Sequence, residues 1–155
     1  MDKDGKVIFE PKYDVILDTA YNDDSMIRIG VNHYRAYERE TTSPTIYKSH
    51  IVGLANCKGE FIIPMEYETI ILPFRSSLFT LREKIHGNYG VVDINNNTVV
   101  EFGLYSWIDG FSNGYSRVKR EGKWGIINEL GEEVLPCKYK HIKDFYGYDR
   151  VWEVK

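Results

Sequence analysis

The chain has 155 residues, a net charge of −3, 43% hydrophobic residues and 14% aromatic residues. This length suits one domain with a hydrophobic core of its own. The two signs of charge are interleaved, so the basic surface typical of nucleic-acid-binding proteins is not expected. The apolar runs are too short to span a membrane. The opening residues, MDKDGKVIFE, do not form a signal peptide, which favours a cytoplasmic location.

The chain contains an internal repeat, shown most clearly by residues 115–142, and it starts and ends inside units of that repeat. Its first turn, at residues 2–5, corresponds to a later turn at residues 128–131, and residues 149–155 match only the first strand of a unit. Such partial units would leave unpaired strand edges. We therefore expect a piece of a longer array or, alternatively, two ends that close against each other.

The segment from Met26 to Cys57 departs most from the repeat pattern. Two runs rich in β-forming residues flank Thr42, Ser43 and Pro44, which predicts an elongated β-hairpin over about residues 26–57. Its outer half concentrates tyrosine and basic residues, namely Tyr34, Arg35, Tyr37, Arg39, Tyr47 and Lys48. Residues of these types anchor interfaces, and insertions into one repeat tend to lie on the functional face. We predict that these six bind a partner; the alternative is that they only keep the hairpin soluble.

No cofactor and no metal ion are expected. Asp93 opens a stretch that resembles a calcium loop, but Thr98 and Leu104 occupy the positions that need glycine and glutamate, so we interpret it as an Asn-rich turn. The four histidines lack metal-ligand spacing. Cys57 and Cys137 lie at different offsets in their units, so no disulfide is expected.

Residues 115–142 show one unit most clearly, with strands expected at residues 115–120, 124–128 and 133–139. Turns at Glu121-Gly122 and Leu130-Gly131 separate them. Gly125 lies within a strand, which indicates a bulge or a close approach by another backbone or ring. Pro136 cannot donate a ladder hydrogen bond, so the third strand is expected at a sheet edge.

The same offsets recur along the chain. A turn residue precedes a tyrosine by eight positions in four places, and an isoleucine follows each tyrosine by three: Ile16, Ile70, Ile108 and Ile142. We expect these isoleucines to be buried between units, because a unit this short cannot bury its own apolar face. The predicted fold is a single all-β domain. It consists of tandem antiparallel three-stranded β-meanders in a solenoid-like or incomplete propeller-like array, with almost no helix.

The unit resembles the WG repeat family, which is found mainly in bacterial proteins. The resemblance rests on Trp124-Gly125, on the turn at Gly131, on Pro136 and Tyr139, and on the entry FSNG at residues 111–114. Other units depart from it: tyrosine and valine replace tryptophan at positions 89 and 52, and Asn97 and Phe102 stand in place of the turn glycine and the proline. The resemblance implies a β-rich repeat array with a binding or scaffolding role and no catalytic residues.

No local motif pairs a nucleophile with a base, or two carboxylates in a cleft. The recurring residues, glycine, tyrosine, isoleucine, proline and tryptophan, build a repeat. We therefore predict a non-catalytic module that interacts with a protein or another extended, polymeric ligand. The alternative is a glycan-directed hydrolase whose carboxylates gather on one rim of a propeller-like domain.

Overall fold

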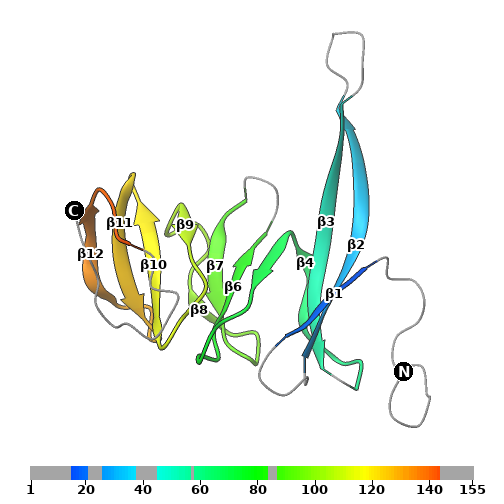
Figure 1. The fold of residues 1–155 in the computed structure, drawn as a ribbon, viewed down its shortest axis with the longest axis horizontal. Coiled ribbons are helices and arrows are strands. Elements are labelled where there is room, and N and C mark those ends of the chain that lie inside the picture. Colours follow the sequence, from blue (N-terminus) through cyan, green and yellow to red (C-terminus); the bar gives the residue numbers. More distant parts are fainter. Residues whose placement is uncertain (1–14, 21–25, 38–44, 57, 84–86, 144–155) are drawn as a thin grey trace. The chain divides into compact units, whose positions relative to one another are not determined.

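The computed structural model describes residues 15–20, 26–37, 45–56, 58–83 and 87–143; up to residue 50 only the backbone is described. The described residues form strands and no helix, which confirms the prediction of an all-β protein (Figure 1). The chain divides into two compact units, Met1–Ile70 and Ile71–Lys155.

The strands form three antiparallel sheets of four strands each. The first sheet contains β1 (Val15–Ala20), β2 (Met26–Tyr37), β3 (Thr45–Asn56) and β4 (Phe61–Tyr67). The second contains β5 (Thr69–Ile71), β6 (Phe79–Arg82), β7 (Tyr89–Val92) and β8 (Thr98–Val100). The third contains β9 (Trp107–Ile108), β10 (Tyr115–Arg120), β11 (Lys123–Asn128) and β12 (Glu133–Tyr139).

Each sheet has one strand more than the predicted three-stranded meander. The additional strand carries the recurring isoleucine and pairs with the first strand of the meander; in the third sheet Ile108 lies opposite Val118 and Trp107 opposite Lys119. A strand as short as β9 shows no alternating pattern in the sequence, because it exists only through its pairing with β10.

The register of the central hairpin is the same in all three sheets. Gly125 lies opposite Val118, Gly90 opposite Leu81, and Gly53 opposite Ile29. The residue before each glycine, Trp124, Tyr89 or Val52, therefore occupies an equivalent place in its sheet. The internal repeat read from the sequence is thus a repeat of backbone structure.

The predicted elongated hairpin is confirmed. Strands β2 and β3 have 12 residues each and pair from Met26↔Asn56 to Tyr37↔Thr45 without a register shift. Figure 1 shows the two strands extending well beyond the other strands of their sheet.

The turns between the second and third strands of the meander share one hydrogen-bonded ring. The amide nitrogen of Asn128 donates to the carbonyl oxygen of Glu132 at 3.0 Å, and the same bond forms from Asn56 to Glu60 (2.9 Å) and from Asp93 to Asn97 (2.9 Å). In the first two turns the asparagine side chain accepts two amide hydrogens and donates to the glutamate carboxylate. In the turn at residues 93–97 the Asp93 carboxylate accepts the two equivalent amide hydrogens, and the Asn97 side chain donates to the same carboxylate.

The structure corrects one position of the repeat pattern, the turn residue predicted at Asn97. Gly59 and Gly131 have positive φ angles of 86° and 78°, and the equivalent residue in the third turn is Asn96, with φ 62°, not Asn97. Asparagine tolerates the left-handed conformation better than most residues, so the turn keeps its shape without glycine. The connection that follows this turn is correspondingly one residue longer than in the other units.

Both features expected as alternatives at Gly125 occur there: a register shift between Trp124 and Ile126 in the pairing with β12, and a close approach by a neighbouring group. A methyl group on Gly125 would lie 2.6 Å from the carbonyl oxygen of Leu135 and 2.8 Å from the sulfur of Cys137. At Gly90 the close neighbour is the ring of Phe102, also at 2.6 Å. Pro136 lies in β12, an edge strand of its sheet, as expected for a residue without an amide hydrogen.

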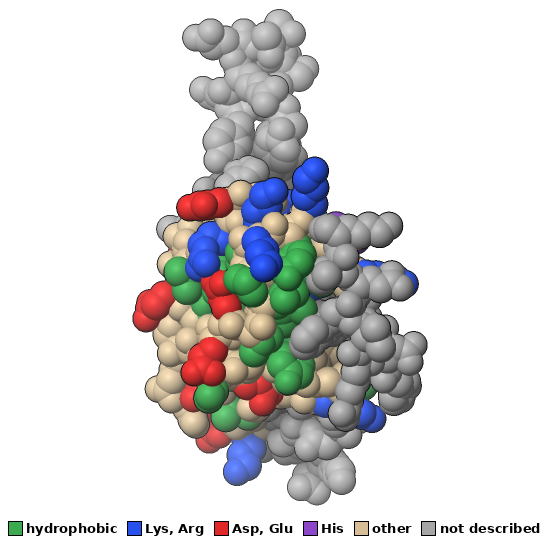
Figure 2. Space-filling view, turned by 90° about the vertical axis from the view of Figure 1, so that its left-hand side faces the viewer, with side chains coloured by type: hydrophobic (Ala, Val, Ile, Leu, Met, Phe, Trp, Pro, Cys, Tyr) green, Lys and Arg blue, Asp and Glu red, His purple; other side chains and the backbone are tan. Residues whose placement is uncertain are grey.

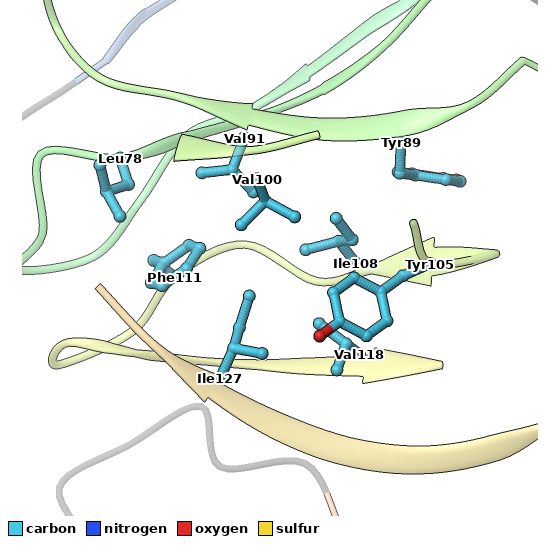
Figure 3. Close-up of a cluster of buried hydrophobic side chains, with 9 residues drawn as sticks. All are labelled: Leu78, Tyr89, Val91, Val100, Tyr105, Ile108, Phe111, Val118 and Ile127. Atoms are coloured by element: carbon cyan, nitrogen blue, oxygen red, sulfur yellow. The ribbon is translucent and has the colours of Figure 1, made fainter. Parts of the chain in front are cut away.

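The best described core lies between the second and third sheets. Figure 3 shows the side chains of the two sheets facing each other across it. Its buried members are Leu78, Tyr89, Val91, Val100, Tyr105, Ile108, Phe111, Val118 and Ile127. Three of the four recurring isoleucines, Ile70, Ile108 and Ile142, are fully buried, as predicted. The side chain of Ile16 lies outside the described residues.

Candidate binding site

An open groove of about 760 Å³ lies on the sheet β9–β12. It is lined by Ser106, Trp107, Asp109, Arg117, Lys119, Gly122 and Trp124. Figure 2 views the molecule from the side on which β11 and β12 lie, and apolar side chains there form a strip with Lys and Arg side chains at its upper end. Among the residues that line the groove are two indole rings, Trp107 and Trp124, and two basic side chains, Arg117 and Lys119.

Strand pairing brings the two indoles to either side of one lysine. Lys119 on β10 lies opposite Trp107 on β9 and opposite Trp124 on β11. The turn at Glu121 and Gly122 fixes the second pairing, since both residues have positive φ angles, 52° and 76°, as the tightest hairpin turn requires. Neighbouring strands are about 4.8 Å apart, so the three residues are close neighbours across the sheet.

Both cations lie against the indole of Trp124. The guanidinium carbon of Arg117 is 5.1 Å from the centre of the ring, and the ammonium nitrogen of Lys119 is 5.3 Å from it. A cation within about 6 Å of an indole face is attracted by its negative electrostatic potential. Trp124 is half-buried, so these contacts hold the ring at the protein surface.

Asp109 neutralises only one of the two cations. Its carboxylate accepts hydrogen bonds from Nε of Arg117 and from Nε1 of Trp107, both at 2.6 Å. Arg117 also donates from Nη1 to the carbonyl oxygen of Ile142 at 2.6 Å. Among the described carboxylates none forms an ion pair with Lys119. Within the described lining, two basic side chains therefore face one carboxylate.

Trp107 connects the groove to the neighbouring sheet. Its ring centre lies 5.0 Å from that of Tyr89 on β7, and the two planes are inclined by 46°. Arg82, opposite Tyr89 on β6, places its guanidinium 5.5 Å from the tyrosine ring. Tyr89 is only 7% exposed, whereas Trp107 is 42% exposed. The indole of Trp107 thus packs against the core at one edge and remains open to solvent at the groove.

A second polar cluster lies on the same sheet, around Glu133. Its carboxylate pairs with Arg120 at 2.6 Å and accepts a hydrogen bond from the hydroxyl of Tyr105 at 3.0 Å. Burial, together with this hydrogen bond and the negative charge of Glu133, raises the pKa of Tyr105 to about 12. Burial likewise raises the pKa of the Cys137 thiol, which is a free cysteine. Each of the carboxylates Asp109 and Glu133 is thus held by a basic residue and an aromatic donor.

The residues proposed from the sequence as a binding surface lie on the hairpin. In the backbone pairing Tyr34 lies opposite Lys48, Arg35 opposite Tyr47, and Tyr37 opposite Thr45. Arg39 lies outside the described residues. The structure thus pairs four of the six predicted residues with one another across two strands, and their role in binding stays a prediction.

Reasoning from the sequence did not propose Trp107, Arg117, Lys119 and Trp124 as site residues. One signal was present: the two-residue turn at Glu121-Gly122 places Lys119 opposite Trp124. Nothing comparable links Trp107 to this pair, since β9 has no turn that fixes its register.

The family model for the WG containing repeat matches four segments of the chain, residues 1–32, 53–82, 89–124 and 124–152. The chain belongs to the WG containing repeat family. The comparisons with curated proteins and with solved structures found no match. The third WG repeat begins at Tyr89 in one sheet and ends at Trp124 in the next. This repeat therefore spans the joint between the second and third sheets.

Two further features bear on what this WG repeat protein can bind. In the described part of the chain no helix has the length and apolar character needed to cross a membrane. The histidine, cysteine, aspartate and glutamate side chains of the same residues form no group of three or more that could hold a metal ion.

Proposed function

We propose that this WG repeat protein is a non-catalytic interaction module that binds a protein or another extended ligand. The observation that carries the proposal is the open groove on the third sheet, where Lys119 lies between Trp107 and Trp124. Indole rings offer large contact areas with few rotatable bonds, and they are enriched among the residues that dominate binding energy. A surface of this kind suits recognition.

The contacts of two carboxylates on the third sheet also favour binding over catalysis. Asp109 is occupied by Arg117 and Trp107, and Glu133 by Arg120 and Tyr105. A glycoside hydrolase needs a second carboxylate beside the first, one acting as an acid and the other as a base or nucleophile. These two carboxylates hold structural contacts instead, so the hydrolase alternative receives no support from them.

The hairpin formed by β2 and β3 is proposed as a further contact surface. Its two strands have 12 residues each, and its outer half pairs Tyr34 with Lys48 and Arg35 with Tyr47. Isolated two-stranded hairpins are marginally stable, so contact with a partner would stabilise the outer half.

The proposal is tested by presenting the immobilised chain with a peptide-display library and with a glycan array. Ligands that the wild type retains are then measured against the double variant Trp107→Ala/Trp124→Ala by calorimetry. We expect the double variant to lose at least about tenfold in affinity, because it removes the two largest contact surfaces. Equal affinity of both proteins for every ligand would place the binding surface elsewhere.

Two controls accompany this experiment. Ligand recovered after prolonged incubation is examined by mass spectrometry, and a shortened or hydrolysed ligand would contradict the non-catalytic assignment. The variant Tyr37→Ala/Arg39→Ala tests the hairpin separately: it should weaken partner binding while leaving the melting temperature nearly unchanged.

A further inference from the structure

The third sheet repeats an arrangement that is already occupied in the second sheet. Tyr89 and Trp124 precede the equivalent glycines of β7 and β11. Each ring has a basic residue opposite it on the neighbouring strand, Arg82 at 5.5 Å and Lys119 at 5.3 Å. Both positions therefore have an aromatic ring, a basic residue opposite it and the same backbone register.

The ring of Tyr89, in the second sheet, is covered by a residue of the chain itself, Trp107. The indole of Trp107 packs against it with the two ring planes inclined by 46°, and Nε1 of that indole donates to the carboxylate of Asp109, two residues further along. The carbonyl oxygen of Asp109 accepts a hydrogen bond from Thr80 of the second sheet at 2.8 Å. A short strand with the pattern tryptophan, any residue, aspartate thus occupies the equivalent of the Trp124 site.

After β12 the described residues begin to repeat this arrangement. Arg117, which stands where Thr80 stands in the second sheet, donates to the carbonyl oxygen of Ile142, and Ile142 is buried like Ile108. The residue in the place of Trp107 is then His141, which is exposed. Among the residues that the structure describes, no aromatic ring pairs with Trp124.

The charge of the groove adds a second requirement. Arg117 is balanced by Asp109, whereas Lys119 has no described carboxylate as a partner. An acidic group on the ligand would supply this carboxylate. The ion pair would lie beside the half-buried indole of Trp124, where partial exclusion of water strengthens it.

From these observations we infer that the groove binds a segment of a partner protein that carries an aromatic side chain with a carboxylate about two residues away. The aromatic ring packs on Trp124 as Trp107 packs on Tyr89, and the carboxylate pairs with Lys119. This inference rests on the proposed function and names the chemical class of its partner.

The test is a selection of random peptides displayed on phage against the full chain, followed by affinity measurements on the enriched peptides. We expect the enriched sequences to share an aromatic residue with Asp or Glu close by. Lys119→Glu should weaken their binding at least about tenfold, since it replaces an attraction by a repulsion. The matched control is Lys123→Glu, which makes the same change of charge at an exposed residue of β11 outside the groove lining. That control should leave affinity within about twofold, and raised salt should weaken binding.

Several outcomes would overturn the inference. Enriched peptides without acidic residues, or equal binding to Lys119→Glu and to the wild type, would remove the role of Lys119. Polygalacturonate, an anionic polysaccharide, is the comparison probe: if it binds and depends on Lys119 while no peptide does, the ligand is a glycan. In that case the inference fails and the proposed function stands. If neither probe gives binding that depends on Trp124 or Lys119, both fail. Melting temperatures of all variants show whether a loss of affinity follows from unfolding.

Discussion

The indole of Trp107 and the phenol ring of Tyr89 meet at 5.0 Å between ring centres, across the joint between two sheets. One residue belongs to β9 and the other to β7, so the contact links strands that share no backbone hydrogen bonds. Backbone hydrogen bonds hold each sheet together, and contacts of this kind, with the shared core, hold the second sheet to the third.

Trp107→Ala should lower the free energy of unfolding by about 1–2 kcal/mol. An aromatic pair contributes about 0.5–1.5 kcal/mol beyond the area it buries, and the half-exposed indole buries some area as well. Urea unfolding followed by circular dichroism measures the change. Trp107→Phe, which keeps a ring at this position, should recover part of the loss; equal stability of the Ala variant and the wild type would mean that the contact does not stabilise the joint.

Ile108→Ala should cost about 2–5 kcal/mol, the usual cost of truncating a fully buried aliphatic side chain. Ile108 is 0% exposed and lies in the core between the two sheets. Leu104→Ala is the control, since Leu104 is 47% exposed and should lose less than about 0.5 kcal/mol. Similar losses for both variants, measured by chemical denaturation, would contradict the placement of this isoleucine in the core.

Gly125→Ala should destabilise the third sheet by at least about 1–3 kcal/mol, because the methyl group would enter space held by backbone. The carbonyl oxygen of Leu135, only 2.6 Å from where that methyl carbon would lie, cannot move without disturbing β12. Combining Gly125→Ala with Cys137→Ala, which makes the neighbouring side chain smaller, tests the cause. Urea unfolding measures the loss of stability. The second substitution relieves the contact with sulfur but not that with the carbonyl, so the double variant should recover only part of the loss.

The contribution of the turn at Asp93 to the free energy of unfolding should depend on pH in the acid range. Hydrogen bonds from the side chain and backbone of Asn97, and from the backbone of Asn95, hold the pKa of this carboxyl below its usual 3.8. A lowered pKa in the folded state contributes stability that is complete above the unfolded pKa and disappears as pH falls through the folded value. Asp93→Ala should therefore be less stable than the wild type at neutral pH, and the difference should shrink below about pH 4. Urea titrations at a series of pH values check this; a constant difference down to pH 2 would exclude a role for the ionised carboxylate.

The sequence predicts the strands of the third meander closely, because its turns are encoded locally. Glu121-Gly122 and Gly131 impose positive φ angles, and the strands follow from them. The presence of a glycine inside the strand likewise predicts the close approach at Gly125. These features depend on residues that are neighbours in the chain.

The groove depends on residues that are brought together by pairing between strands. Trp107 reaches Lys119 only through β9, a strand too short to be recognised before its partner is known. The position of the turn at Asn96 was missed for a related reason. No glycine marks the left-handed residue there, and the connection to Tyr105 is one residue longer, so counting eight residues back from the tyrosine misplaces the turn by one.

The hydrogen-bonded turns limit how the repeats can diverge from one another. Residues 56 and 60, like residues 128 and 132, place the amide first and the carboxylate last, whereas residues 93 and 97 reverse the order. Changing only Asn128 to Asp would set two carboxylates against each other, and like charges this close repel. The two positions must therefore be substituted as a pair, and they are expected to show correlated substitution whenever one repeat of this kind is compared with another.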